Sequence, residues 1–293
     1  MPAIRPYHFA QFRAAGFLPF YRAIVAADGI VCFDFEDSMQ AETEAATACL
    51  KQGQRRQVRQ LLQGPGLRPD RLAVRINAPT TPHYRADLAA LRGLPGLHAV
   101  FVPKVAHPEH LRQVLRELPL PVRHVVAVVE TQAGFAALPE LLALRDARLG
   151  RLAFGHCDYN LSLGNFPFHH HDSATYWAWL AELDAHLHAA GRQLLNSPVL
   201  RLADAALFQD VLGRLRAYPS ATGQITLCLS QTLACAAPAR PAPGRTLAAG
   251  SEESESLCHG FEQGRLPGRA FAVDATRRLI SPHEYEAARW QPA

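Results

Sequence analysis

The chain has 293 residues, 48% of them hydrophobic, and a formal net charge of +4 at pH 7. This length and apolar content suffice for one large core, either a single α/β barrel or two smaller domains. The charge is slight and no basic block stands out, so the composition gives no support for a nucleic-acid partner or a membrane surface.

Cysteine usage points to a reducing compartment. The six cysteines are scattered, without a CxxC pair, which predicts reduced thiols rather than a disulfide framework. The sequence shows no signal-peptide pattern and no apolar run of 18 residues. We therefore expect a cytoplasmic protein of bacterial type.

Strand and helix patterns alternate along the chain. Helical spacing of apolar residues is clearest in residues 17–27, 108–118 and 176–190. Eight βα units within about 230 residues predict a (β/α)₈ TIM barrel. A doubly wound open sheet is the alternative, but no GxGxxG turn supports it. The expected strands are residues 4–9, 29–35, 72–77, 97–104, 125–130, 152–155, 193–197 and 224–229.

The chain changes character after the eighth expected strand. Residues 234–250 are rich in Pro, Ala and Gly, which predicts a linker. Beyond it, residues 251–263 suggest a helix, 271–273 a strand and 282–290 a last helix. The sequence therefore predicts a barrel over residues 1–233, and a linker with a C-terminal lid or subunit-docking segment over residues 234–293.

Two expected strands end in an acidic residue. The run VVAVVETQAG at 125–134 is a buried parallel strand that ends in Glu130. Burying an unpaired carboxylate is unfavourable or raises its pKa, so a glutamate in this position usually faces a cation or a water-filled cavity. RLAFG at 151–155 repeats the pattern and leads to Asp158. Two such acids suggest an oxygen-rich metal site, although two unrelated acids at loop starts remain an alternative.

Barrel geometry would bring further charged residues to the same face. The carboxyl ends of parallel barrel strands open onto one side, where such barrels hold their chemistry. An excess of acids there suits Mg²⁺, for which two carboxylates and substrate oxygens suffice. Arg75 would remain for a carboxylate or an enolate oxygen. The residues expected on this face are Asp34, Glu36, Asp37, Arg75, Asn77, Lys104, Glu130 and Asp158.

Several nearby residues allow more than one interpretation. Lys104 could form a Schiff base, but the neighbouring acids favour a protonated side chain that balances charge or binds a carboxylate. His169, His170 and His171 suggest zinc, yet three consecutive histidines cannot all face one ion, so a polar loop near the site is favoured. His156 is equally consistent with a general base and with a loop histidine.

Five motifs together carry a family resemblance. They are FDFEDSM at 33–39, VRIN at 74–77, VPK at 102–104, VVETQAG at 128–134 and FGHCDYNLSLG at 154–164. In order and spacing they resemble the citrate lyase beta-subunit-like branch of the HpcH/HpaI aldolase/citrate lyase family. Fainter similarity continues in ATGQITLCLSQ at 221–231 and in residues 268–290.

The resemblance implies roles for individual positions. Glu130 and Asp158 match the two carboxylates that hold Mg²⁺ in the family. Arg75 matches the arginine that contacts the substrate or enolate oxygen. Glu36 and Asp37 match acids that hold waters around the metal, a role that orients its direct ligands.

The resemblance also implies an activity. Lys104 and Gly155 join Arg75 as expected substrate-binding residues. Family members are Mg²⁺-dependent carbon-carbon lyases that cleave citryl, malyl or citramalyl thioesters to a keto acid and an acetyl thioester. The implied partners are a keto acid and a CoA or acyl-carrier thioester, in a homotrimer or hexamer.

Other functions stay open at this point. IRPYHFAQFRAAGFLPF at 4–20 replaces the Arg-Ser and Pro-Gly-Asn pattern of typical members, and Leu229 and Ser230 stand where His-Pro is usual. A class II aldolase acting on a free hydroxy-keto acid and a non-catalytic keto-acid-binding homologue are therefore alternatives. Asp274 could be an acid/base that reaches a neighbour's site, or a surface acid.

Overall fold

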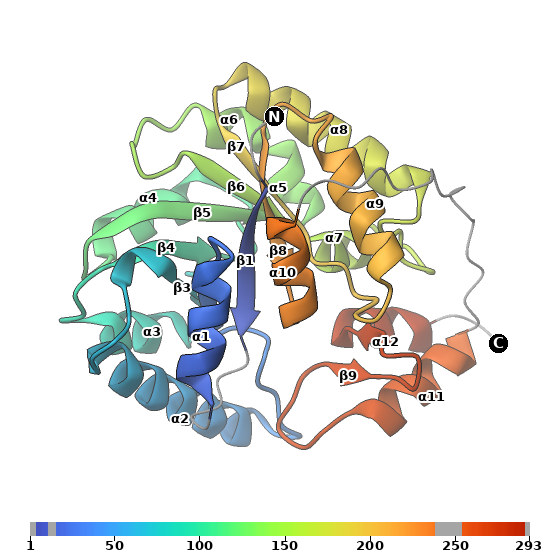
Figure 1. Cartoon of the computed structure of the whole chain (residues 1–293), viewed down its shortest axis with the longest axis horizontal. Coiled ribbons are helices and arrows are strands. Elements are labelled where there is room, and N and C mark those ends of the chain that lie inside the picture. Colours follow the sequence, from blue (N-terminus) through green and yellow to red (C-terminus); the bar gives the residue numbers. More distant parts are fainter. Residues whose placement is uncertain (1–3, 11–15, 238–253, 291–293) are drawn as a thin grey trace.

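The computed structural model describes residues 4–10, 16–237 and 254–290. Within these residues, eight parallel strands close into a barrel in chain order, and helices surround it (Figure 1). The predicted (β/α)₈ fold is confirmed. The strands are β1 (Arg5–Ala10), β2 (Ile30–Asp34), β3 (Leu72–Arg75), β4 (Leu97–Val102), β5 (Val122–Val129), β6 (Arg151–Phe154), β7 (Gln193–Asn196) and β8 (Ala221–Thr226).

Helices follow the strands on the outside of the barrel. The first group comprises α1 (Phe17–Ala26), α2 (Glu44–Gln63), the 3₁₀ turn η1 (Pro69–Arg71), α3 (Tyr84–Leu91) and α4 (Pro108–Glu117). The second group comprises α5 (Gln132–Ala136), α6 (Leu138–Leu142), α7 (His156–Ser162), α8 (Ala174–Ala189), α9 (Ala205–Leu215) and α10 (Leu229–Ala236). In the described part of the chain, no helix is both long and apolar enough to cross a membrane.

The predicted strands differ from the observed ones mainly at their ends. β5 begins at Val122 because this residue pairs with Leu97 of β4. β8 runs from Ala221 to Thr226, three residues earlier than expected, because Leu229 already starts α10. That helix continues to Ala236, so the first residues of the expected linker are helical. The part of the linker from residue 238 onward lies outside the described residues.

Both faces of the barrel strands are buried, as their near-continuous apolar sequences require. One set of strand side chains, which includes Val74 and Val100, packs outward in the same apolar cluster as Leu180 of α8. The other set fills the barrel interior, where Phe101, Val126 and Ile225 belong to a separate apolar cluster. This interior packing supports the strand ends that carry the polar residues.

The C-terminal segment (residues 254–290) packs beside the barrel. Its elements are α11 (Ser254–Gly264), β9 (Ala272–Val273), β10 (Leu279–Ile280) and α12 (Pro282–Arg289), and they lie together on one side of the molecule (Figure 1). Leu257, Phe261 and Ile280 belong to a small core of their own. The Leu279 N–H donates to the Leu200 carbonyl at 2.9 Å, which ties the segment to the loop after β7.

Polar side chains lie inside the barrel near the amino ends of its strands. Arg151 donates to the Tyr7 hydroxyl at 2.7 Å and to Gln193 at 2.7 Å. The rings of His98 and His124 meet edge to face, with centroids 5.1 Å apart. Burial, reinforced by nearby Arg151, lowers the pKa of His98 to about 3 and that of His124 to about 4. Both imidazoles are therefore neutral at pH 7.

The neutral state of His124 makes stability sensitive to acid. The unfolded chain takes up a proton on this ring below its ordinary pKa of 6.5, whereas the folded chain does so only near 4. The unfolded state then binds more protons, so the free energy of unfolding falls as the pH drops from 7 to 5.

The substitution His124→Phe should reduce this fall in the free energy of unfolding between pH 7 and pH 5 by about 1 kcal/mol. The value is smaller than the full pKa shift would give, because the ring is only partly buried. Neither ring nitrogen of His124 has a hydrogen-bond partner within the described residues, so phenylalanine leaves no group unsatisfied. Urea unfolding at pH 7 and pH 5 measures the difference. The control His188→Phe, at an exposed position, should keep the native pH dependence; equal losses in both variants would contradict the prediction.

Candidate active site at the barrel mouth

The charged residues singled out in the sequence meet at the carboxyl ends of the strands. Asp34 ends β2 and Arg75 ends β3, and Lys104 lies just beyond β4. Glu130 follows β5 directly, and Asp158 lies in the first turn of α7 after β6. The placement follows from the parallel register, as the sequence predicted.

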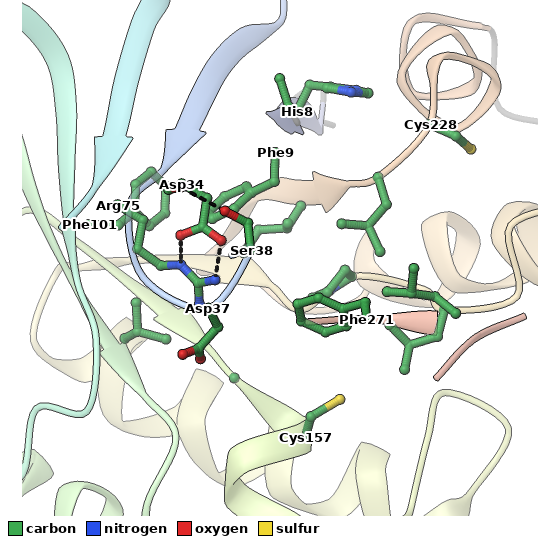
Figure 2. Close-up of a pocket in the computed structure, with 18 of the residues that line it drawn as sticks. His8, Phe9, Asp34, Asp37, Ser38, Arg75, Phe101, Cys157, Cys228 and Phe271 are labelled. Carbon is green, nitrogen blue, oxygen red and sulfur yellow. Dashed lines mark hydrogen bonds and ion pairs between the residues drawn. The ribbon is translucent and has the colours of Figure 1, made fainter. Parts of the chain in front are cut away.

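Arg75 is held by two acids that come from the end of β2 and the loop after it. Its Nε and Nη2 each donate to a different carboxylate oxygen of Asp34 at 2.7 Å, a two-pronged pair visible in Figure 2. Its Nη1 lies 2.8 Å from Oε2 of Glu36. Burial opposes the charge, but Asp34 and Glu36 outweigh it and raise the pKa of Arg75 well above its ordinary value. The guanidinium is fixed in place and permanently charged.

Lys104 lies among three carboxylates. Its Nζ is 3.1 Å from Glu36, 3.5 Å from Asp37 and 3.5 Å from Asp158. Burial lowers the pKa of Lys104, but Glu36, Asp37 and Asp158 outweigh this effect and raise it. An ammonium with a raised pKa does not form a Schiff base readily. The arrangement favours charge balance, the interpretation that the sequence also favoured.

Glu130 is buried with little compensation. The residue is only 2% exposed. Its Oε1 accepts a hydrogen bond of 2.7 Å from the backbone N–H of Lys104. Burial raises the pKa of Glu130 well above its ordinary value, and Asp158 and Glu36 raise it further. Ionisation of Glu130 is therefore unfavourable unless a further cation lies beside it, which favours an added cation at the mouth.

Gly155 makes room for Glu130. A Cβ atom at this position would lie 2.4 Å from Oε2 of Glu130, closer than packed atoms can approach. The first residue after β6 can therefore be only glycine while Glu130 keeps its position. The predicted role of Gly155 in substrate binding remains a prediction, whereas its contact with Glu130 is direct.

His283 of the C-terminal segment completes a group of candidate metal ligands that the sequence did not predict. One ligand atom each from Asp37, Asp158 and His283 lie within 4.8 Å of one another. Nε2 of His283 is 3.3 Å from Oδ1 of Asp158. Burial opposes ionisation of Asp37, but Lys104 and Arg75 outweigh it and lower the pKa to about 2. The carboxyl oxygens of Asp37 and Asp158, with Glu130 nearby, fit a hard divalent cation such as Mg²⁺.

A cavity of about 510 Å³ opens onto these residues. Asp34, Asp37, Arg75, Glu130, Asp158 and His283 line its polar side. The volume lies within the range of about 300–1,000 Å³ that is typical of small-molecule sites. The arrangement can bind an anionic ligand through a cation and Arg75 together. The direct ligation of a metal by Glu130 and Asp158 stays a prediction.

A hydrogen-bonded chain links α7 to the C-terminal segment. Nε2 of His156 lies 2.9 Å from Nδ1 of His170, and Nε2 of His170 lies 2.8 Å from Glu284. Arg278 also pairs with Glu284. Burial lowers the pKa of His156 well below its ordinary value, with His170 adding to the effect. Because the ring is neutral and is hydrogen-bonded to His170, a structural role for His156 is favoured over that of a general base.

The remaining sequence candidates lie apart from the metal-ligand group. Within the described residues, His169, His170 and His171 belong to no cluster suited to a metal. They lie in the loop after α7, near the mouth, as expected for a polar βα loop. Asp274 accepts hydrogen bonds of 2.9 Å from the backbone N–H groups of Thr276 and Arg278, so it closes a turn in its own chain. Its proposed reach into a neighbour's site stays a prediction.

Comparisons with known proteins agree with this architecture. The profile of the family described as HpcH/HpaI aldolase/citrate lyase matches residues 21–200, which is more than half of the chain. A citrate lyase subunit beta-like protein of Mycobacterium tuberculosis is 34% identical over 142 residues, which is 48% of this chain and 41% of that protein. The match thus spans well under half of that relative's length.

Solved structures show the same fold at lower identity. The citrate lyase beta subunit of M. tuberculosis complexed with oxaloacetate and magnesium has a TM-score of 0.61 at 21% identity, over 80% of this chain and 96% of that one. The CitE protein of that organism with magnesium, acetoacetate and coenzyme A has a TM-score of 0.61 at 21% identity, over 98% and 96% of the two chains. RipC from Yersinia pestis has a TM-score of 0.59 at 20% identity, over 80% and 95%.

The contact between Gly155 and Glu130 can be tested by adding one methyl group. Gly155→Ala should lower the free energy of unfolding by about 1–3 kcal/mol, because Glu130 or the backbone must move. Gly150→Ala is the matched control, since a Cβ there meets nothing within 4 Å, and it should stay within about 0.5 kcal/mol of the native chain. Urea unfolding measures both. Equal stability of the two variants would show that Glu130 does not occupy the space beside residue 155.

Proposed function

Because the chain belongs to the HpcH/HpaI aldolase/citrate lyase family, we propose that it is a Mg²⁺-dependent carbon-carbon lyase. Its proposed reaction is cleavage of a hydroxyacyl thioester of the citryl, malyl or citramalyl type to a keto acid and an acetyl thioester. The observation that carries the proposal is the convergence of Glu130, Asp158 and Arg75 on one cavity at the barrel mouth. CoA or an acyl-carrier protein would present the thioester.

Glu130 and Asp158 would hold the cation, and Glu36 and Asp37 would accept hydrogen bonds from waters around it. A bound Mg²⁺ would supply Lewis-acid polarisation of the keto-acid carbonyl. In the cleavage direction the substrate hydroxyl loses its proton and the bond between its carbon and the neighbouring methylene breaks. The electron pair of that bond passes to the methylene carbon, forming the thioester enolate, which then takes up a proton.

Arg75 would stabilise the negative charge that develops on the enolate oxygen. Arginine has five N–H donors; Asp34 takes two of them, and Nη1 lies beside Glu36. Donors therefore remain for a ligand, while the two bonds to Asp34 fix the plane of the guanidinium. Lys104, which lies between the acids, would bind a substrate carboxylate or balance charge when the site is loaded.

We propose that the C-terminal segment forms a lid over this site. Phe271, Leu279 and His283 of that segment line the cavity, and His283 contacts Asp158. A segment in this position excludes water from one side of the reacting groups. A cytoplasmic homotrimer or hexamer belongs to the same proposal and rests on the family alone.

An aldolase acting on a free hydroxy-keto acid is the second candidate. The metal-binding acids and Arg75 would serve it equally, since the same type of bond breaks. The departure from the family pattern in residues 4–20 favours it, because that pattern surrounds the first strand, where carrier contacts are expected. A non-catalytic keto-acid-binding homologue would keep the binding site and lack turnover.

Cleavage should depend on the two proposed metal ligands. Glu130→Gln and Asp158→Asn keep the side-chain shape and remove the charge, so each should lower Mg²⁺-dependent cleavage of the best thioester substrate by at least about 100-fold. Malyl-CoA, citramalyl-CoA and citryl-CoA are the substrates to assay, with product formation as the readout. Glu140→Gln, an exposed acid on α6, is the control and should retain native activity. Native turnover by Glu130→Gln would exclude the proposed role.

Binding of Mg²⁺ should also stabilise the fold. At a free Mg²⁺ concentration of about 100 times Kd, the free energy of unfolding should rise by about 2.7 kcal/mol. The rise should disappear with EDTA and be much smaller in Glu130→Gln. Thermal unfolding with and without Mg²⁺ and a keto acid measures it. Stabilisation by both ligands without cleavage of any thioester or hydroxy-keto acid would identify a non-catalytic homologue.

A further inference from the structure

The cavity at the barrel mouth has two chemically different sides. Arg75 and the acids line one side. The other side is apolar and is built from several parts of the chain: Phe9 of β1, Phe20 of α1, Phe154 of β6, Leu200 after β7, Ile225 of β8 and Phe271 of the C-terminal segment. Figure 2 shows Phe271 across the cavity from Arg75 and Asp37.

Part of this apolar side faces open space. Phe9, Phe20 and Phe271 are partly exposed, whereas Leu200 and Ile225 are only 5% and 6% exposed. An apolar group placed against these rings would leave water, which favours its binding. The cavity therefore favours a ligand that carries an apolar substituent beside its polar head.

Few cationic side chains of the described residues lie around the cavity. Among the described residues that line the cavity, Arg75 is the only one with a cationic lysine or arginine side chain. Asp34 and Glu36 already pair with it. Lys104 lies among Glu36, Asp37 and Asp158. No lysine or arginine of the described chain lines the apolar side, so a second substrate carboxylate placed there would have no cationic partner among the described residues.

His8 does not supply that missing charge. It lines the cavity near the apolar side, and its Nδ1 is 2.8 Å from the Thr232 hydroxyl. Burial lowers the pKa of His8 to about 4, so the ring is neutral at pH 7. His283 lies at the opposite, acidic side, against Asp158.

We propose that the site prefers 2-keto acids whose substituent is an uncharged alkyl or aryl group over dicarboxylates such as oxaloacetate. This inference rests on the proposed function and narrows its substrate class. The keto-acid head would lie at the acids and Arg75, and the substituent would pack against Phe9, Phe20 and Phe271. In the cleavage direction, the parent substrate is a hydroxyacyl compound with the same apolar substituent on its hydroxyl-bearing carbon.

The proposal can be tested by calorimetric titration of the full chain in saturating Mg²⁺. Pyruvate, 2-oxobutanoate and 2-oxohexanoate form a series of growing alkyl length, and phenylpyruvate adds an aryl group. Affinity should rise up to about four-fold per added methylene, the equivalent of about 0.8 kcal/mol. Oxaloacetate and 2-oxoglutarate should bind at least about ten-fold more weakly than 2-oxohexanoate.

A charge placed on the apolar side should reverse the order. Leu202, which lines the cavity and is partly exposed, is a suitable position. Leu202→Arg should strengthen 2-oxoglutarate binding by about ten-fold and weaken 2-oxohexanoate binding. Leu202→Met adds no charge and is the matched control, with the native order expected. If Leu202→Arg does not fold, the series on the native chain still decides the question.

The outcomes separate this inference from the proposed function. If pyruvate and its homologues bind and oxaloacetate binds more tightly than 2-oxohexanoate, the substrate class is wrong while the lyase proposal stands. An affinity that does not change along the alkyl series would assign the apolar side to another group, such as the arm of a thioester carrier, and would overturn the inference. If no keto acid binds with Mg²⁺, the proposed function fails and the inference fails with it.

Discussion

The mouth of the barrel depends on a balance between buried or partly buried acids and two partly buried cations. Asp34, Glu36, Asp37, Glu130 and Asp158 converge there, and Arg75 and Lys104 lie among them. Removing several carboxylates from water is unfavourable unless each finds a cation or a hydrogen-bond donor.

The acids of this group differ in how far cations and hydrogen-bond donors offset their negative charge. Asp34 shares two bonds with Arg75, whereas Glu130 receives one backbone N–H and has a strongly raised pKa. An arrangement with this imbalance gains from a further cation, and oxygen donors select a hard one. Under the proposed function, the same imbalance means that a keto acid with its own negative head should bind together with the metal rather than alone.

Much of this site could be predicted from the sequence because it depends on local patterns. A buried parallel strand is an apolar run, and its carboxyl end must lie at the mouth, so Glu130 and Asp158 could be placed there without coordinates. The pairing of Asp34 with Arg75 follows only from the exact register of β2 and β3, which apolar patterns define to within a few residues. The end of β8 was missed for the same reason, since Leu227 and Leu229 continue the apolar run into α10.

The contribution of the C-terminal segment could not be predicted. His283 reaches Asp158 across more than 100 residues of sequence, and Glu284 reaches His170 in the same way. Such contacts leave no periodic signal, because they depend on how a separate small core docks on the barrel. The apolar side of the cavity is equally hidden, since Phe9 and Phe271 look like ordinary core residues until the strands and the segment meet.

We propose that Glu130 and Asp158 coordinate one divalent ion. The most direct measurement is anomalous diffraction from crystals of the protein soaked in Mn²⁺. We expect a single peak at the barrel mouth, about 2.1 Å from a carboxylate oxygen of each of the two residues. A peak held by Asp37, Asp158 and His283 without Glu130, or the absence of any peak between the strand ends, would contradict the claim.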